Sequence, residues 1–341
     1  MKHLFCVHSS ITWLIALQVI KEEVLNEEDC AMVYYRNLKI DPKGKERIAK
    51  LPFSVFYPHD ELSLKALFWN NWKNTKKLDN FASELTNGQP FRLYLPHSDM
   101  NYAALLLSHS LCESFAYIEE GLLSYVQKSE MGIINVKKKI WLRELWYYLA
   151  FKGRNQSVKP SFFEEHPKYA KSYGLSDLAF PFLKNTQVLS LPFEHKEKYE
   201  GISNLLLIGG EIEGTLINAK TAEIAYNRML AFMVEQGVKD VWVKFHPRNT
   251  PKSIDLYNNI LTKYSINLHY LDATDVPEHI LFSSNATLYT TLSSAAYYAY
   301  LCKCPVYSCA KIMGKHSPEF HRVMNKLPSF FRNIFNYIPS I

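Results

Sequence analysis

The sequence predicts an α/β protein with two Rossmann-like domains whose parallel sheets face each other across a cleft. Two series of short apolar strands alternate with longer helical segments, one series in each half of the chain. A less periodic stretch with several prolines, residues 151–192, connects them. The length of 341 residues suits two domains. We expect the domains at residues 1–185 and 186–320, followed by a basic and aromatic tail at residues 321–341.

The first series opens the chain with an apolar strand at residues 4–7. Ser9 or Ser10 is expected to cap a helix at residues 11–24. Polar residues interrupt this segment before it reaches the roughly 18 to 20 apolar residues that span a bilayer, so we expect neither an anchor nor a signal peptide. Further strands are expected from Met32 and at residues 51–57, 91–96 and 114–118, with helices at residues 62–72 and 102–111.

The second series repeats this alternation in the last third of the chain. Short apolar runs between turn residues predict buried strands, and longer amphipathic runs predict helices. The expected strands occupy residues 204–210, 240–245, 266–271 and 279–284, and the expected helices occupy residues 219–236, 254–264 and 293–301.

Composition and charge narrow the class of partner. The formal charge of +6 and the pI near 8.8 favour phosphate-bearing donors, acidic polysaccharides or a phospholipid surface, and they are too mild to indicate nucleic acid. The 6 cysteines lie mostly in apolar stretches without paired metal-binding spacing, which predicts reduced core thiols in a cytosolic protein.

A pair of acidic residues follows one strand of the first half. Open parallel sheets bind ligands at the carboxyl ends of their strands, so residues directly after strands are the candidates for function. Glu119 and Glu120 hold such a position, and Gly121 lets the backbone turn. Two adjacent carboxylates repel, which raises the pKa of one of them and makes it a candidate general base. A solvated charged turn is the alternative.

The stretch KFHPRN places a histidine at a strand exit in the second half. Pro247 fixes its own φ and restricts His246 to extended geometry, so the imidazole is aimed rather than free. Lys244 and Arg248 flank it with positive charge. Such a histidine can donate a hydrogen bond or a proton to a leaving phosphate, and a purely structural histidine is the alternative.

Three other patterns in the second half suit a nucleotide. Ser293 and Ser294 precede an apolar helix, where hydroxyls and free N–H groups either bind phosphate or only cap the helix. Glu278 follows a proline and either accepts hydrogen bonds from a ribose or simply opens a helix. Gly209 and Gly210 allow a nucleotide to approach the backbone closely, although they do not match a dinucleotide fingerprint.

Taken in order, these motifs resemble those of a known family. IEEGLLSY, KFHPRN and TLSSA are similar to the acidic-acidic-Gly, His-Pro and Ser-Ser signatures of the bacterial sialyltransferases of the lipooligosaccharide and polysialic-acid capsule type. The motifs span most of the chain, but the likeness is confined to them. The resemblance implies a GT-B fold that binds the donor, CMP-sialic acid, mainly through the second domain. It also implies that the anomeric configuration inverts and that no metal or other cofactor is required.

The resemblance assigns a role to each motif. Glu120 or Glu119 removes a proton from the acceptor hydroxyl, and His246 stabilises or protonates the departing CMP phosphate. Consecutive residues at a strand end point in different directions, so only one glutamate should face the cleft, and we favour Glu120. The other residues expected to bind the donor are Gly209, Gly210, Lys244, Pro247, Glu278, Ser293 and Ser294, and the candidates on the acceptor side are His8, Ser9, His97 and Asp99.

Two other functions fit the same residues. One is a GT-B transferase that uses another cytidine-activated donor, such as a Kdo-type sugar or CDP-glycerol, and the Glu-Glu-Gly motif favours sialyl transfer over it. The other is a non-catalytic glycan-binding protein of the same fold. The combination of acid, base and phosphate-holding residues argues against that second alternative.

Two segments mix basic and aromatic residues, namely residues 136–154 and residues 320–341. Such segments predict contact with an anionic membrane, and helices that pack on their own domain are the alternative. We therefore expect a cytoplasmic protein that binds peripherally to the cytoplasmic face of the inner membrane. Its expected partners are a nucleotide-sugar donor and an oligosaccharide or lipid-linked glycan acceptor, and no nucleic acid.

Overall fold

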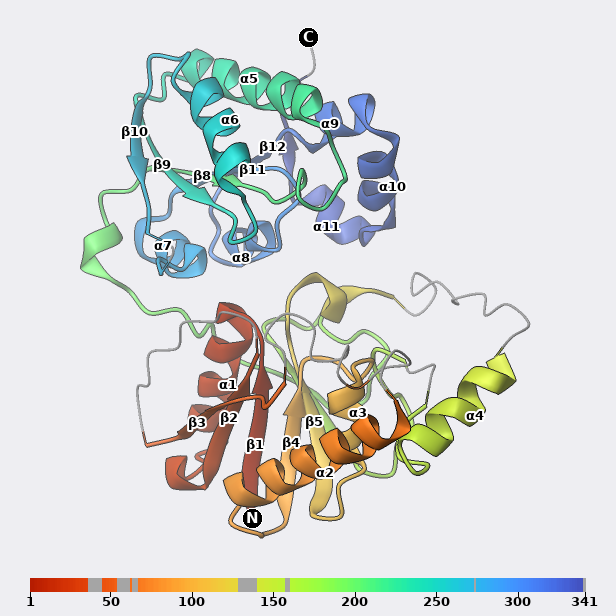
Figure 1. Cartoon of the computed structure of the whole chain (residues 1–341). Helices are drawn as coiled ribbons and strands as arrows, with labels where there is room; N and C mark the ends of the chain where they lie inside the picture. The colour runs from red at the N-terminus through yellow and green to blue at the C-terminus, as the bar shows by residue number, and fades with distance from the viewer. Residues whose placement is uncertain are drawn as a thin grey trace. The chain divides into compact units, whose positions relative to one another are not determined.

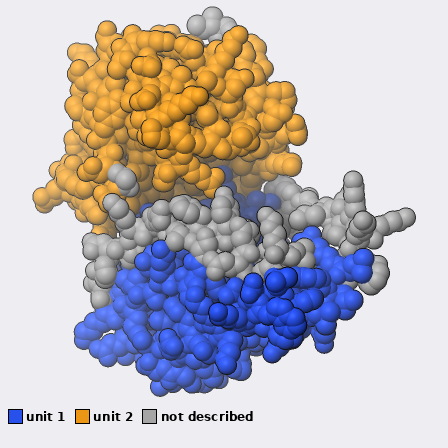
Figure 2. Space-filling model, in the orientation of Figure 1, with its two compact units in different colours: residues 1–192 blue, residues 193–341 orange. Residues whose placement is uncertain are grey.

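The computed structural model describes residues 1–35, 45–53, 62, 67–127, 140–156, 160–272 and 274–339. The chain divides into two compact units, Met1–Pro192 (unit 1) and Phe193–Ile341 (unit 2), which Figure 2 shows in different colours. Each unit contains a parallel sheet with helices packed against it (Figure 1), so the prediction of two Rossmann-like domains is confirmed.

Unit 1 is built on a seven-stranded parallel sheet in the order β3-β2-β1-β4-β5-β6-β7. The strand order reverses between β1 and β4, and this switch point is where open α/β sheets bind ligands. The strands are β1 (Lys2–Val7), β2 (Cys30–Tyr34), β3 (Arg47–Lys50), β4 (Phe91–Leu95), β5 (Cys112–Ile118), β6 (Tyr169–Gly174) and β7 (Thr186–Val188).

The helices of unit 1 cover this sheet. β1 is buried over nearly its whole length, as expected for a parallel strand with helices on both faces. Residues Ile15, Ala16 and Val19 of the first helix are fully buried. The helices are α1 (Ser10–Glu22), α2 (Phe68–Leu85), α3 (Asn101–Leu107) and α4 (Ile140–Ala150), with short 3₁₀ turns η1 (Glu27–Asp29) and η2 (Leu122–Tyr125).

Unit 2 repeats the plan with a six-stranded parallel sheet in the order β10-β9-β8-β11-β12-β13, which reverses between β8 and β11. Its strands are β8 (Asn204–Ile208), β9 (Asp240–Phe245), β10 (Asn267–Tyr270), β11 (Thr287–Thr290), β12 (Val306–Ser308) and β13 (Asn336–Tyr337). Its helices are η3 (Glu197–Tyr199), α5 (Ala219–Glu235), α6 (Pro251–Leu261), α7 (Pro277–Ser284), α8 (Ala295–Leu301), α9 (Ala310–His316), α10 (Pro318–Lys326) and α11 (Ser329–Asn333).

Apolar side chains from helices and strands form the core of unit 2. Met229 and Leu230 of α5 are fully buried in one cluster with Val241 and Val243 of β9. All six cysteines of the chain are free thiols, and all except Cys302 are buried. None of the described helices combines the length and the hydropathy needed to cross a membrane.

The boundary between the units lies later than expected. The chain divides after Pro192 rather than after residue 185, because β6 and β7 pair with the first sheet. The interpretation of residues 151–192 as a connection is therefore wrong. Polar residues such as Lys171 and Ser172 in β6 mask the apolar signal of this strand.

Residues 321–339, the described part of the expected tail, belong to unit 2. β13 pairs with β12, and the rings of Phe331 and Phe335 are buried with their centroids 4.9 Å apart. The aromatic residues of this segment therefore pack within unit 2, as the alternative for this segment predicts.

Three expected elements differ in the structure. Residues 279–284 belong to helix α7 and not to a strand, because Pro277 starts a helix at its first position and the short apolar run is ambiguous by itself. A strand is expected at residues 51–57, but the strand in this region, β3, ends earlier, at Lys50. Residues 51–53 are not in a strand, and residues 54–57 lie outside the described residues. The helix expected at residues 62–72 begins only at Phe68 and continues to Leu85.

Candidate functional site

The expected site residues of each unit lie at the carboxyl ends of its strands. His8 directly follows β1, His97 lies just beyond β4, and Glu119 directly follows β5. In unit 2 the corresponding residues are Gly209 and Gly210 after β8, His246 and Pro247 after β9, Glu278 in the first turn of α7, and Ser293 and Ser294 between β11 and α8. Because parallel strands end at the same edge, each unit gathers its own candidates there.

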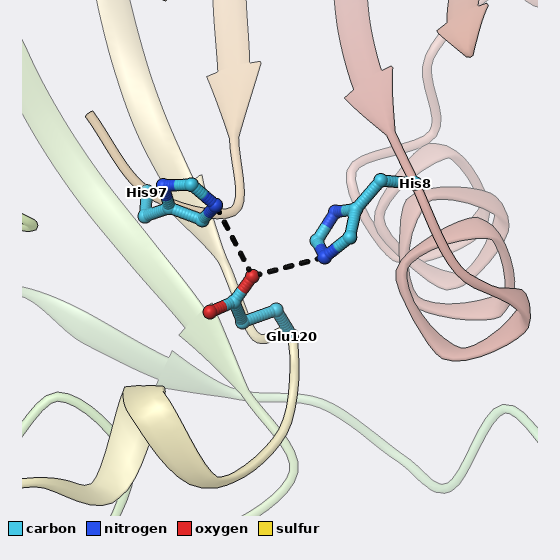
Figure 3. Close-up of side chains that lie close together, drawn as sticks. All are labelled: His8, His97 and Glu120. Carbon is cyan, nitrogen blue, oxygen red and sulfur yellow. Dashed lines mark ion pairs between the residues drawn. The ribbon is translucent and has the colours of Figure 1, made fainter. Parts of the chain in front are cut away.

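Three side chains of unit 1 converge at its switch point (Figure 3). Nε2 of His8 lies 3.1 Å from Oε2 of Glu120, and Nε2 of His97 lies 3.5 Å from the same oxygen. The two imidazoles meet edge to face with centroids 5.9 Å apart. The side chains of His8 and His97 are each 8% exposed and that of Glu120 is 12% exposed, so water screens these pairs only weakly.

The start of α1 fixes the position of His8. Its backbone N–H donates to Oγ1 of Thr12 at 3.0 Å, and its ring stacks on Tyr35 with centroids 5.6 Å apart. Ser9 is the N-cap, as predicted, and forms a capping box with Thr12. The Ser9 hydroxyl therefore caps helix α1. A contact between Ser9 and an acceptor stays a prediction.

Asp99 orients His97 from the opposite side of the ring. Its carboxylate pairs with Nδ1 of His97, and its second oxygen accepts a hydrogen bond from the hydroxyl of Ser161 at 3.2 Å. This contact holds the ring from its Nδ1 side and leaves Nε2 of His97 directed at Glu120.

Glu119 points away from this cluster into the core of unit 1. Its side chain is fully buried, and its Oε2 accepts hydrogen bonds from the hydroxyl of Tyr125 at 2.6 Å and from the N–H of Leu175 at 2.7 Å. Glu119 thus ties the end of β5 to η2 and to the loop after β6. The geometry separates the two glutamates into a structural carboxylate and one that faces the histidines.

The pKa of Glu120 is set by its neighbours. Burial alone would raise it, but the hydrogen bond from His8 and the positive charge of His97 outweigh burial and hold the pKa below its ordinary value. The expectation that repulsion between adjacent carboxylates raises a pKa here is therefore wrong for Glu120. The two carboxylates point in different directions, and histidines surround this one.

Two glycines let side chains pack against the backbone after β8. A Cβ on Gly210 would lie 2.9 Å from Nδ1 of His246, and one on Gly209 would overlap the carboxylate of Glu211. The amide of Asn249 donates to the carbonyl of Gly209 at 2.9 Å and joins this loop to the one after β9. Small residues are therefore needed at both positions.

The backbone fixes the tautomer of His246. Its Nδ1 accepts a hydrogen bond from the N–H of Arg248 at 3.1 Å, so in the neutral ring Nε2 carries the proton. Desolvation and the positive charge of Arg248 lower its pKa. The sequence leaves open whether this histidine donates a hydrogen bond or a proton; without a bound anion, the lowered pKa favours the neutral ring with an Nε2–H donor. Pro247 is exposed beside it.

Two acidic residues of this loop escaped the sequence analysis. Glu211 is buried, its Oε1 accepts a hydrogen bond from the hydroxyl of Thr291, and its Oε2 has no hydrogen-bond partner within the described residues. Burial raises its pKa. Glu213 accepts from the N–H of Thr250 at 3.0 Å and so holds the loop to the start of α6. In the sequence, only the pattern EIEG after the two glycines indicates these two acidic residues.

Lys244 lies near the end of β9, and Glu278 lies in the first turn of α7. Nζ of Lys244 donates to the carbonyl of Asp272 at 2.8 Å, and burial lowers its pKa. Glu278 is buried in the first turn of α7, and burial raises its pKa while the charge of Lys244 opposes that shift. Lys244 therefore braces the loop after β10, and a direct contact with a donor stays a prediction.

Ser293 and Ser294 are half-buried where α8 begins. The Ser293 hydroxyl accepts from the N–H of Ala295 at 3.2 Å, and Ser294 is the N-cap but makes no capping hydrogen bond with its side chain. Within the described residues, no hydrogen bond joins either serine to His246 or Glu278. The structure places these groups at one edge of the sheet without direct contact.

A cavity of about 390 Å³ opens beside the same loop of unit 2. Its walls come from the loop after Glu211, from the start of α5 and from the junction of α9 and α10. Asn218, His316 and Glu319 give it a partly polar lining. None of these residues stood out in the sequence, because they lie outside any motif.

No family model and no curated protein matches the chain, whereas solved structures do. A sialyltransferase from Photobacterium damsela matches with a TM-score of 0.52 and 12% identity, over 98% of this chain and 81% of that chain. A UDP-GlcNAc 2-epimerase from Methanocaldococcus jannaschii matches with a TM-score of 0.50 and 10% identity, over 90% of this chain and 83% of that chain. The chain has the GT-B fold. At these identities the likeness concerns the fold alone and does not choose between the activities.

The two glutamates should differ in their effect on stability. We expect Glu119→Ala to lower the free energy of unfolding by about 2 to 6 kcal/mol, because two buried donors lose their acceptor at about 1 to 3 kcal/mol each. Glu120→Ala should cost clearly less. Urea denaturation followed by circular dichroism measures both, and equal losses would contradict the separation of their roles.

Glu211 should make the stability depend on pH. Its folded-state pKa lies above its unfolded value, so the buried charge destabilises the protein as pH rises through the folded-state pKa. Glu211→Gln should therefore raise the Tm at pH 8, and the gain should shrink toward pH 4, where the carboxyl is protonated in the folded state and largely protonated in the unfolded state. Calorimetry across this range checks the trend, and a gain that is largest at acid pH would contradict it.

Proposed function

We propose that the chain is an inverting glycosyltransferase that moves sialic acid from CMP-sialic acid to a hydroxyl of a bacterial surface glycan, a lipooligosaccharide or a capsular polysaccharide. The observation that carries the proposal is the Glu120 carboxylate, held between two histidines at the switch point of unit 1. The motif resemblance and the GT-B fold support it.

Glu120 is the proposed general base. Its lowered pKa keeps it ionised at neutral pH, so it can accept the proton of an acceptor hydroxyl. That hydroxyl becomes acidic as its oxygen bonds to the oxocarbenium-like anomeric carbon, which allows a weakly basic carboxylate to take the proton. The bond between the anomeric carbon and the phosphate oxygen breaks on the opposite side, so the configuration inverts.

Unit 2 supplies the proposed donor contacts. Nε2–H of His246 donates to the departing phosphate, whose negative charge raises the pKa of this histidine and lets it act as an acid. The hydroxyls of Ser293 and Ser294 bind the phosphate, and Glu278 accepts hydrogen bonds from the ribose. These donors offset the charge of the leaving group, so we propose that transfer requires no divalent metal.

Nucleotide binding tests the proposal most directly. We expect isothermal titration in EDTA to show that the protein binds CMP in preference to UMP and GMP. Glu278→Ala and Ser294→Ala should each weaken CMP binding at least about tenfold, because each removes a proposed ribose or phosphate contact. Ser284→Ala is the control, because its hydroxyl bonds only to nearby backbone, donating to the carbonyl of Ile280 and accepting from the N–H of Ala286.

The nucleotide preference decides between the candidate functions. Selective CMP binding followed by transfer from CMP-sialic acid, lost in Glu120→Ala, would establish the activity. Stronger binding of CDP-glycerol would favour the alternative cytidine donor. Binding of UMP or UDP-GlcNAc alone, or of no nucleotide, would contradict the proposal.

We also propose that unit 1 contacts an anionic membrane through what we call the α2–α4 face. The two helices α2 and α4 adjoin (Figure 1): the indole of Trp72 donates to the carbonyl of Leu149 at 3.0 Å, and Phe68 stacks on Trp146. Exposed Lys73, Lys76, Lys77, Arg143 and Lys152 accompany the exposed Leu67, Trp69, Trp72, Leu142, Leu145, Tyr148 and Leu149. Such a mixture suits the interface of an anionic bilayer that holds a lipid-linked acceptor.

Vesicle binding tests the α2–α4 face. We expect the protein to sediment with vesicles that contain phosphatidylglycerol. Leu145→Glu should prevent this binding, because it replaces an apolar side chain that would enter the bilayer with a negative charge that the anionic lipids repel. Val234→Glu on α5 is the matched control, since Val234 is 45% exposed and Leu145 is 48% exposed. Equal losses in both variants, or no binding by the wild type, would contradict this surface.

A further inference from the structure

We propose that His8, His97 and Glu120 form a binding site for a divalent transition-metal ion, with Zn²⁺ as the preferred ion, and that occupancy inhibits the protein. The potential ligand atoms of these residues all lie within 4.8 Å of one another. Two imidazoles and one carboxylate are a ligand set that suits zinc and its neighbours in the transition series, and they leave a fourth position open.

The geometry of the three side chains supports the site. Nε2 of His8 and Nε2 of His97 lie 3.1 Å and 3.5 Å from the same atom, Oε2 of Glu120. A cation between the two imidazoles and the carboxylate would be bound by all three groups at once, and a buried carboxylate requires a partner of this kind.

The surroundings match a built metal site. A histidine that binds a metal usually has a carboxylate beside its other ring nitrogen, and the carboxylate of Asp99 lies beside Nδ1 of His97. The hydroxyl of Ser161 holds Asp99 in turn. Each of the three ligands follows a different strand of one sheet, as Figure 3 shows for His8, His97 and Glu120. The site therefore lies wholly within unit 1.

Inhibition follows from the use of the same carboxylate. A metal on Oε2 of Glu120 withdraws charge from the carboxylate and so lowers its basicity toward the acceptor proton. This part rests on the proposed function, whereas metal binding itself does not. A chain that binds Zn²⁺ but no CMP would contradict the proposed function and leave the metal site in place.

Titration with Zn²⁺ alone tests the site without any activity assay. We expect the wild-type protein to bind one tight equivalent, and His97→Gln and Glu120→Gln each to weaken that binding at least about a hundredfold, because each removes a ligand. Asp99→Asn should weaken it about 10- to 100-fold, as is typical when the partner of a ligating histidine is lost. His269→Gln is the matched control, because His269 also pairs with a carboxylate, at 3.1 Å from Asp240, but lies on the surface.

Cobalt distinguishes this site from the cysteines. Co²⁺ bound by imidazole and carboxylate gives visible ligand-field bands, and thiolate ligands add a strong charge-transfer band in the near ultraviolet. We expect the ligand-field bands without the thiolate charge-transfer band. Thermal melts should show that each variant is folded, and His8→Gln is measured in place of any variant that is unfolded. No stoichiometric binding, binding unchanged in His97→Gln, or a thiolate band that disappears in Cys302→Ser would overturn the proposal.

Discussion

The pairing of β1 with β4 is the constraint on which the candidate site of unit 1 depends. Phe5 pairs with Tyr94 in parallel register, so the two strands end side by side although nearly ninety residues separate them in the chain. The strand order of the sheet reverses between β1 and β4, so the connections that follow these two strands run in opposite directions. His8 and His97 are therefore brought to one carboxylate by the sheet itself, and no flexible loop has to position them.

The two units place charge differently at equivalent edges of their sheets. In unit 1, two histidines keep Glu120 ionised despite its burial, so this unit suits the acceptance of a proton. In unit 2, burial raises the pKa values of Glu211 and Glu278, and burial with the charge of Arg248 lowers that of His246. Glu213 differs, because hydrogen bonds from Ser253 and Thr250 hold its pKa below the ordinary value despite burial. This edge therefore combines a neutral imidazole donor with an ionised carboxylate.

The sequence predicted the fold and the location of the candidates better than their chemistry. Parallel strands must end at one edge, so strand exits could be identified from apolar runs followed by His97, Glu120 or His246. The strands β6 and β7 could not be found, because their polar residues break the apolar pattern. Nor could the pKa of Glu120 be predicted, because it depends on histidines about twenty and more than a hundred residues earlier in the chain.

The position of Glu120 links the proposed catalysis to the proposed metal site. Its carboxylate lies between His8 and His97, so the two imidazoles can either interact with the carboxylate directly or bind a metal ion together with it. Without a metal ion, the two histidines keep Glu120 ionised, and the carboxylate can accept the proton of a sugar hydroxyl. With a metal ion bound, the same carboxylate is a ligand and loses basicity. Metal occupancy thus decides whether this edge of unit 1 acts as a base or as a metal site.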